Sequence, residues 1–331
     1  MAVYAISDLH GALDEFRHLL ARIGFRYNGA DELYLVGDYG DWGKKSLETI
    51  QFVRHLDSVY PFVHCLMGNH EEMFLTAAEH DEAGTIDRES LDNWLYYNRG
   101  LDTWNGYLSL PKEQKASLRR WLKGLPLSAS VSIGGMNLML AHAYPYYYDM
   151  NYTEREKEHH RHEALWRRLN LQENPFADYT GTKRYDYFIC GHTITSYYED
   201  AQRKEKNPSF VTGMQLSRCR IFHGGMFLDI DCGAKCFDYV NDENPALHLA
   251  GQRAQLAALK LDTMEEYYVH PQMFLTDLPV PDMQSFPETV DDMNLQKTVF
   301  PSGVGRAAKA FLRARQMPWE SLMKKGHDDE S

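Results

Sequence analysis

The sequence predicts an α/β fold, because short apolar runs with strand character alternate with segments of helical period. Residues 2–7, 32–37 and 60–67 are rich in Val, Ile, Leu and Tyr, as buried strands are. Between them, residues 13–24 and 46–56 carry apolar side chains at the spacing of an amphipathic helix. Strands and helices that alternate in this way are typical of layered α/β domains.

The same signals recur later in the chain. The expected elements are a hairpin over residues 127–143 that turns at Gly134 and Gly135, a buried strand over residues 185–191 and a strand group over residues 220–234. Residues 245–261 fit either a helix or a strand.

We expect one main domain over residues 1–261, interrupted by helical insertions at about residues 71–125 and 152–171. From residue 262 the composition changes, and the chain becomes rich in Pro and acidic residues. Residues 262–331 are therefore predicted to form a C-terminal extension that wraps the main domain or reaches a partner.

Composition restricts the class of protein. The chain has 331 residues, 44% of them hydrophobic, and its formal net charge of -12 disfavours binding to nucleic acid or to anionic membrane. No apolar run approaches the roughly 20 residues that span a bilayer, and the N-terminus lacks the pattern of a secretory signal. Five scattered cysteines do not suggest a disulfide framework, so we expect a soluble protein in the reducing cytoplasm.

Polar side chains with metal-binding chemistry follow five of the apolar runs. They are Asp8 and His10, Asp38 and Asp41, Asn69 and His70, then His142, and finally His192. In α/β sheets, ligands bind beyond the carboxyl ends of the strands, so these side chains are expected to converge. Taken singly, each fits a cap, a turn or a buried histidine, but five such coincidences at strand ends are improbable. Carboxylate, imidazole and amide oxygen together suit Mn²⁺, Fe or Zn²⁺.

At these residues the chain resembles the calcineurin-like metallophosphoesterases, in particular the bacterial branch similar to phosphoprotein phosphatases and symmetrical diadenosine tetraphosphatases. The matching motifs are "DLH", "GDYGDWG", "GNHE", "LAHA" and "GHT", with weaker echoes at "NRGLDT", "LWRR" and "IDCGA". The resemblance covers about residues 3–240. It implies two packed mixed β-sheets flanked by helices, with two divalent metal ions at the strand ends and the catalytic domain within residues 1–261.

The resemblance also implies a role for each ligand. Asp8 and His10 would bind the first metal ion, Asp38 would bridge both, and Asn69, His142 and His192 would complete the second. Mn²⁺ is the expected metal, with Fe or Zn²⁺ as alternatives. A bridging carboxylate offsets repulsion between two cations, and the pair can activate a hydroxide for in-line attack on phosphorus.

By the same resemblance, His70 would protonate the leaving alkoxide and Asp41 would hold it. Many relatives end in GHxH, where the second histidine also binds metal. Here Ile194 occupies that position, which favours the protein-phosphatase-like branch.

One residue departs from the family pattern, because Trp42 stands where relatives have an arginine that binds the substrate phosphate. Arg99 is the first candidate to replace that cation and Arg167 the second, although each also fits a solvated helix face. Trp42 itself could stack on a nucleobase or a phosphotyrosine ring, or be a buried aromatic under the loop.

The sequence thus predicts a dinuclear-metal phosphoesterase that hydrolyses phosphomonoesters, with phosphorylated proteins or small phosphoesters as substrates. A symmetrical dinucleoside tetraphosphate hydrolase is the alternative within enzymes. A phosphate-binding regulatory module with impaired catalysis is the alternative of another class, and Trp42 is its only support.

Overall fold

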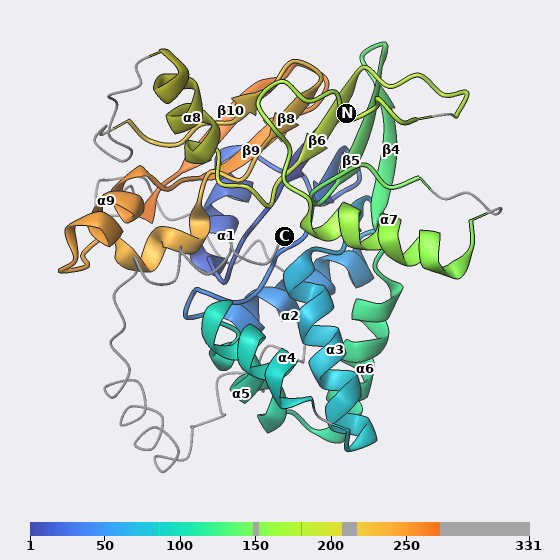
Figure 1. Ribbon diagram of the computed structural model, residues 1–331, viewed down its shortest axis with the longest axis vertical. Coiled ribbons are helices and arrows are strands. Elements are labelled where there is room, and N and C mark those ends of the chain that lie inside the picture. Colours follow the sequence, from blue (N-terminus) through green and yellow to red (C-terminus); the bar gives the residue numbers. More distant parts are fainter. Residues whose placement is uncertain (86, 148–151, 180, 207–216, 272–331) are drawn as a thin grey trace, which may run out of the picture. The chain divides into compact units, whose positions relative to one another are not determined.

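The structure is a computed structural model of the whole chain, and it describes residues 1–85, 87–147, 152–179, 181–206 and 217–271. Within those residues, the strands form two five-stranded sheets, and helices pack on them (Figure 1). The sequence-based expectation of an α/β protein with two packed mixed sheets is confirmed.

The first sheet has the order β10-β9-β1-β2-β3. Its strands are β1 (Ala2–Ile6), β2 (Asp31–Leu35), β3 (Val63–Cys65), β9 (Leu256–Lys260) and β10 (Glu265–Val269). Strands β1, β2 and β3 are parallel and are joined through helices α1 (Leu13–Arg22) and α2 (Ser46–Val59), as the sequence predicts. Because the three strands run the same way, the loops that follow them emerge at one edge of the sheet.

The second sheet has the order β4-β5-β6-β8-β7. Its strands are β4 (Ser128–Ile133), β5 (Met136–Ala141), β6 (Tyr187–Cys190), β7 (Phe222–His223) and β8 (Phe227–Asp229). The β4–β5 hairpin turns at Gly134 and Gly135, whose φ angles of 60° and 81° favour glycine. Strands β5, β6 and β8 are parallel, so a second set of loops also shares one edge.

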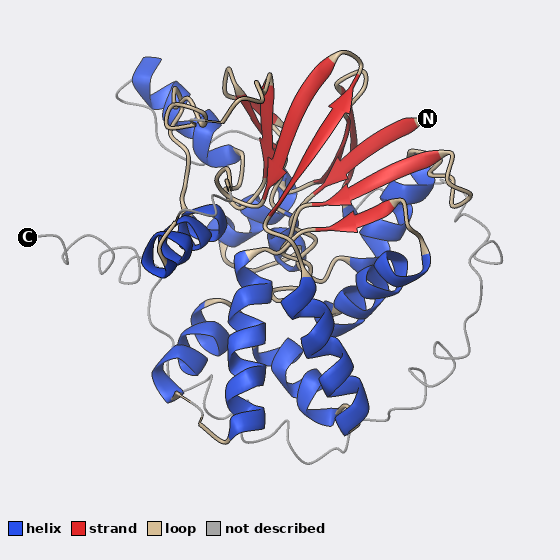
Figure 2. Ribbon diagram, turned by 90° about the vertical axis from the view of Figure 1, so that its right-hand side faces the viewer, coloured by secondary structure: helices blue, strands red, loops and turns tan. Residues whose placement is uncertain are grey.

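Alternate side chains of each strand enter different layers of the core. In β1, Val3 and Ala5 pack with Leu138, Leu140 and other apolar residues of the second sheet, so the two sheets lie face to face. The intervening residues of β1 point to the opposite face, where they pack with side chains of α1, α2 and α3. Figure 2 shows the strands together on one side of the helical cluster.

The segment between β3 and β4 is helical. It contains α3 (Asn69–Ala83), α4 (Arg88–Asp92), a π-helical turn (Asn93–Tyr97), α5 (Leu101–Ser109) and α6 (Lys112–Gly124). Helix α7 (Glu154–Trp166) precedes β6, and α8 (Ser196–Lys206) follows it. No helix among the described residues has both the length and the apolar character needed to cross a membrane.

The ambiguous segment 245–261 contains both kinds of structure, since α9 (Pro245–Arg253) is followed directly by β9. Strand β10 then pairs with β9 in an antiparallel hairpin. The first sheet therefore continues to Val269, eight residues past the boundary expected at residue 261, because the tyrosines and the valine of "EEYYV" suit a strand. The rest of the expected extension, from residue 272 onward, lies outside the described residues.

Candidate metal centre

The loops that follow the strands hold an unusual backbone conformation. Eight non-glycine residues in the described part of the chain have a positive φ, and seven of them are residues that the sequence singles out. These seven are Asp8, His10, Asp38, Asp41, Trp42, Arg99 and His192, with φ between 42° and 70°. Side chains with a Cβ rarely adopt this conformation, and such strain clusters at functional sites.

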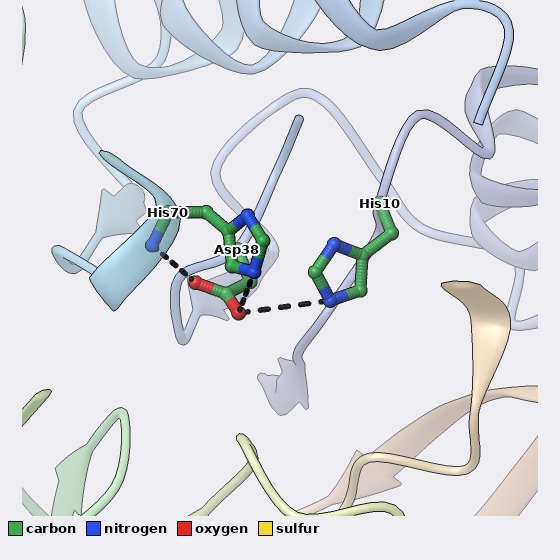
Figure 3. A group of neighbouring side chains, drawn as sticks. All are labelled: His10, Asp38 and His70. Atoms are coloured by element: carbon green, nitrogen blue, oxygen red, sulfur yellow. Dashed lines mark hydrogen bonds and ion pairs between the residues drawn. The ribbon is translucent and has the colours of Figure 1, made fainter. Parts of the chain in front are cut away.

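The carboxylate of Asp38 lies at the middle of the polar cluster. Its Oδ2 is 3.6 Å from Nε2 of His10 and 3.9 Å from Nε2 of His70, and its Oδ1 is 3.4 Å from Nε2 of His142. Figure 3 shows the rings of His10 and His70 next to the same oxygen of this carboxylate. Two groups that could each hold a metal ion share Asp38, namely His10, Asp38 and His70, and Asp38, His142 and His192.

Backbone carbonyls orient the histidine rings. Nδ1 of His10 lies 3.0 Å from the carbonyl oxygen of Gly40, and Nδ1 of His142 lies 2.9 Å from that of Val36. Each Nδ1–H therefore donates to a carbonyl, which turns Nε2 toward the Asp38 carboxylate. This is the arrangement that metal-binding histidines require, because the second ring nitrogen fixes the tautomer and the ring.

Asn69 and His192 complete the second group. Oδ1 of Asn69 lies 2.9 Å from Nε2 of His142 and 3.1 Å from Nδ1 of His192. Nε2 of His192 is in turn 3.1 Å from the carbonyl oxygen of Trp166, to which it donates. In this orientation, the Asn69 oxygen and the His192 Nδ1 lone pair converge on the same space as Asp38. A convergence of oxygen and nitrogen acceptors fits a cation of borderline hardness.

Asp8 faces the same centre from the end of β1. Its carboxylate accepts hydrogen bonds from the backbone N–H of His192 at 3.1 and 3.2 Å, and its Oδ1 is 3.8 Å from Nε2 of His10. Burial raises the pKa of Asp8 well above its usual range, and the nearby Asp231 raises it further. Burying several carboxylates costs desolvation free energy unless positive charge compensates them. A metal ion would supply that charge, so this set of donors fits a bound metal.

The pKa of His142 also indicates that these buried carboxylates require a nearby positive charge. Burial by itself disfavours the imidazolium, but Asp38 and Asp8 outweigh it and raise the pKa of His142 to about 10. A proton on His142 then supplies positive charge to the buried acids. Metal ligands must be deprotonated, so a bound cation would take over that role from the proton.

His70 lies beside the metal ligands and contacts a different carboxylate. Its Nδ1 is 2.6 Å from Oδ2 of Asp41. The same oxygen accepts a hydrogen bond from Nε1 of Trp94 at 2.6 Å, and Oδ1 of Asp41 accepts one from Oγ1 of Thr103 at 2.5 Å. Burial opposes the charged form of His70, but Asp38 and Asp41 together raise its pKa. The expected pairing of His70 with Asp41 is thus present, and neither Trp94 nor Thr103 was singled out in the sequence.

Glu71 holds the loop that carries Asp38. Its carboxylate accepts the backbone N–H groups of Asp38 at 2.7 Å, Tyr39 at 2.9 Å and Gly68 at 3.0 Å. Glu71 was not among the residues singled out from the sequence, although its place in "GNHE" was a signal. Gly68 is required here, because a Cβ atom would come within 2.2 Å of Oδ1 of Asp38.

Two further groups near the centre were missed. Asp231 is buried, follows β8 in "IDCGA", and its Oδ2 has no hydrogen-bond partner among the described residues. Arg168 donates to the carbonyl oxygen of His192 at 3.1 Å and to Oγ1 of Thr193 at 2.9 Å. The weaker motif matches "IDCGA" and "LWRR" contain these two residues and could have indicated them.

The residues expected to bind substrate behave differently from one another. Arg167 pairs with Glu163 at 3.0 Å and Glu173 at 2.5 Å, and its guanidinium lies 4.0 Å from the centre of the Tyr144 ring. Its charge is thus already engaged by two glutamates, and the neighbouring Arg168 contacts the loop of His192 instead. The carbonyl oxygen of Arg99 accepts the backbone N–H of Trp42 at 3.3 Å.

Two packed sheets whose strand ends share one buried His/Asp centre are the architecture of a dinuclear metallophosphoesterase. The family model described as calcineurin-like phosphoesterase matches residues 1–196, and the chain belongs to this family. The family expected from the sequence motifs is confirmed.

Curated relatives match over shorter stretches. The symmetrical bis(5'-nucleosyl)-tetraphosphatase of Neisseria gonorrhoeae is 49% identical over 101 residues, which are 30% of this chain and 34% of that protein. The protein of the same name from Nitrosococcus oceani is 38% identical over 141 residues, 43% of this chain and 44% of that protein. The chain thus matches less than half the length of either relative.

Solved structures resemble the chain at low sequence identity. A metallophosphoesterase from Sphaerobacter thermophilus is 16% identical, with a TM-score of 0.42, and the similarity covers 82% of this chain and 89% of that one. A protein serine/threonine phosphatase from Saccharomyces cerevisiae is 12% identical, with a TM-score of 0.46 over 78% of this chain and 71% of that one.

Proposed function

We propose that the protein is a metal-dependent phosphoesterase that hydrolyses phosphomonoesters, including phosphoserine and phosphothreonine in proteins. The observation that carries this proposal is the sharing of Asp38 by two candidate metal groups, one of which includes a histidine, His70, that Asp41 holds. A shared carboxylate permits two cations close together, and phosphoryl transfer depends chiefly on positioning and on neutralising negative charge.

In this proposal the chain supplies two sets of metal ligands. Asp8, His10 and Asp38 hold one divalent ion, and Asp38, Asn69, His142 and His192 hold the other. Mn²⁺ is the metal we expect, with Fe or Zn²⁺ as alternatives. When bound, the ions supply Lewis-acid chemistry, which offsets charge on the phosphoryl group and makes water a better nucleophile.

His70 acts in the proposal as the general acid. A proton on its Nε2 passes to the leaving oxygen of the ester, while Nδ1–H keeps its hydrogen bond to Asp41. Asp41 orients the ring and stabilises the imidazolium. The bonds from Trp94 and Thr103 in turn hold the Asp41 carboxylate in place.

The proposal is tested by hydrolysis of p-nitrophenyl phosphate by the intact protein and by Asp38→Asn, each after chelation and after addition of Mn²⁺. We expect turnover only with metal, and its loss in Asp38→Asn. Turnover that survives chelation, or that Asp38→Asn retains, would contradict it. Binding of phosphate without turnover of any substrate would instead favour a regulatory module with impaired catalysis.

A second candidate is hydrolysis of symmetrical dinucleoside tetraphosphates. The names of the curated relatives favour it. The same metal ligands and the same acid would then act on a phosphoanhydride instead of an ester. Offering diadenosine tetraphosphate and a phosphoserine peptide to the same Mn²⁺-loaded protein separates the two candidates, with ADP as the product that marks symmetrical cleavage.

A further inference from the structure

Trp42 lies next to a residue of the metal centre, and two cations lie near its ring. Its ring centre is 6.5 Å from that of His10, in an edge-to-face arrangement. The ammonium nitrogen of Lys235 lies 5.2 Å from the centre of the same ring, and the guanidinium of Arg99 lies 5.9 Å from it. Both distances are within the range of cation–π attraction. The tryptophan that replaces the family arginine is thus itself a support for positive charge.

Of the two cations, Lys235 lies nearer the ring of Trp42, at 5.2 Å against 5.9 Å for Arg99. It lies in the 3-10 helix Ala234–Tyr239, which begins directly after the loop of Asp231. Burial raises the pKa of Asp231, and Lys235 is the charge that most offsets this rise.

Arg99 differs from Lys235 in its exposure. Its side chain is exposed, whereas that of Lys235 is half-buried. Arg99, which the sequence suggests first, is therefore the more exposed of the two cations near the Trp42 ring, and Lys235 is the more enclosed.

We propose that Lys235, positioned on the ring of Trp42, binds the substrate phosphate in this protein and takes the place of the family arginine. This inference rests on the proposed function, since it assigns the phosphate-binding residue of the same site. An ammonium group offers three donors and a compact charge, but it lacks the planar fork of a guanidinium. A flexible lysine needs a support to hold its charge toward one point, and the aromatic ring supplies that support.

The assignment also gives Trp42 a role that needs no direct contact with phosphate. Its indole has a single N–H donor, which could not replace the paired hydrogen bonds of an arginine. With cations within reach of its ring, Trp42 is less available for stacking on a nucleobase. The change from arginine to tryptophan is then compensated by a residue almost two hundred positions later in the chain.

The test uses calorimetric titration of inorganic phosphate into the Mn²⁺-loaded full chain, together with KM and kcat for p-nitrophenyl phosphate. The variants are Lys235→Met, which keeps the length of the side chain and removes its charge, and Lys235→Arg. The control is Lys123→Met, since Lys123 is exposed on α6 and pairs with Glu79 at 3.0 Å. Mn²⁺ titration of each variant checks that the metal ligands remain intact.

We expect Lys235→Met to raise the Kd for phosphate and the KM by roughly ten-fold or more, as loss of a charged hydrogen bond does, with a smaller change in kcat. Lys235→Arg should recover most of the affinity, and Trp42→Ala should lose part of it. A Kd in Lys235→Met that matches Lys123→Met would overturn the assignment, as would an intact protein that binds no phosphate. If phosphate binding depends on Lys235 while no ester is hydrolysed, the assignment stands and the proposed function fails.

Discussion

Nδ1 of His70 lies 2.6 Å from Oδ2 of Asp41, while Nε2 of the same ring lies 3.9 Å from Oδ2 of Asp38. One carboxylate thus holds the ring, and the other belongs to the candidate metal groups. Nε2, the ring nitrogen of His70 that does not contact Asp41, faces the Asp38 carboxylate. His70 also belongs to one of the two groups that could hold a metal ion, so the first prediction separates an acid from a ligand.

His70→Asn is expected to lower kcat by roughly 10² to 10⁴, the usual contribution of a general acid. The loss should be larger for a phosphoserine peptide than for p-nitrophenyl phosphate, because a nitrophenolate leaves without needing a proton. Steady-state rates on both substrates measure this difference. An equal loss on both, with weakened Mn²⁺ binding, would mean that His70 is a metal ligand.

Removal of metal is expected to destabilise the folded protein, because Asp8, Asp38 and Asp231 are buried close together. Metal at a hundredfold excess over its Kd stabilises a protein by about 2.7 kcal/mol. Thermal unfolding should therefore shift upward when Mn²⁺ replaces chelator. Asp38→Asn should lose that shift, and an undiminished shift in this variant would contradict the shared role of Asp38.

Glu71→Gln is expected to weaken metal binding without removing a ligand. The carboxylate accepts three backbone N–H groups, including that of Asp38, and an amide cannot accept all three. Changes behind metal ligands typically cost roughly 10- to 100-fold in metal affinity. Mn²⁺ titration measures this loss, and Glu79→Gln, on the same helix and paired with the exposed Lys123, is the matched control. Equal Mn²⁺ affinities in the two variants would contradict the role of Glu71 in holding the loop that carries Asp38.

Glu266 is expected to make stability depend on pH in the acid range. The hydrogen bond from His223, with those from Tyr268 and Arg220, lowers its pKa from 4.5 to about 2. A carboxyl whose pKa is lower in the folded state stabilises the protein above its unfolded value, and that contribution is lost as the pH falls from about 4.5 toward 2. After allowance for solvent screening, Glu266→Gln should cost about 1 kcal/mol at pH 7.

Urea unfolding at several pH values tests this expectation. The difference between the intact protein and Glu266→Gln should be greatest near neutral pH and should shrink as the solution approaches pH 2. The exposed Glu205→Gln is the control. A difference that stays constant with pH would show that Glu266 stabilises the hairpin by packing alone.

The sequence by itself determined the alternation of strands and helices, and it identified Asp8, Asp38 and His192 as residues that follow strands. These features are local, since a period of two or 3.6 and a polar residue after an apolar run can be counted along the chain. Motif order then identified the family before any coordinates. Local pattern could not decide whether residues 245–261 form helix or strand, and the structure contains one of each.

Only the tertiary structure decided which cation lies near the substitution at position 42. Arg99 and Arg167 were chosen because they stand in family motifs. Arg99 does lie 5.9 Å from the centre of the Trp42 ring, but two glutamates engage Arg167, and Lys235, which no motif indicates, lies 5.2 Å from the same ring. Lys235 follows a strand of the second sheet and Trp42 a strand of the first. Their contact depends on how the two sheets pack, which is a long-range property that no window of sequence contains.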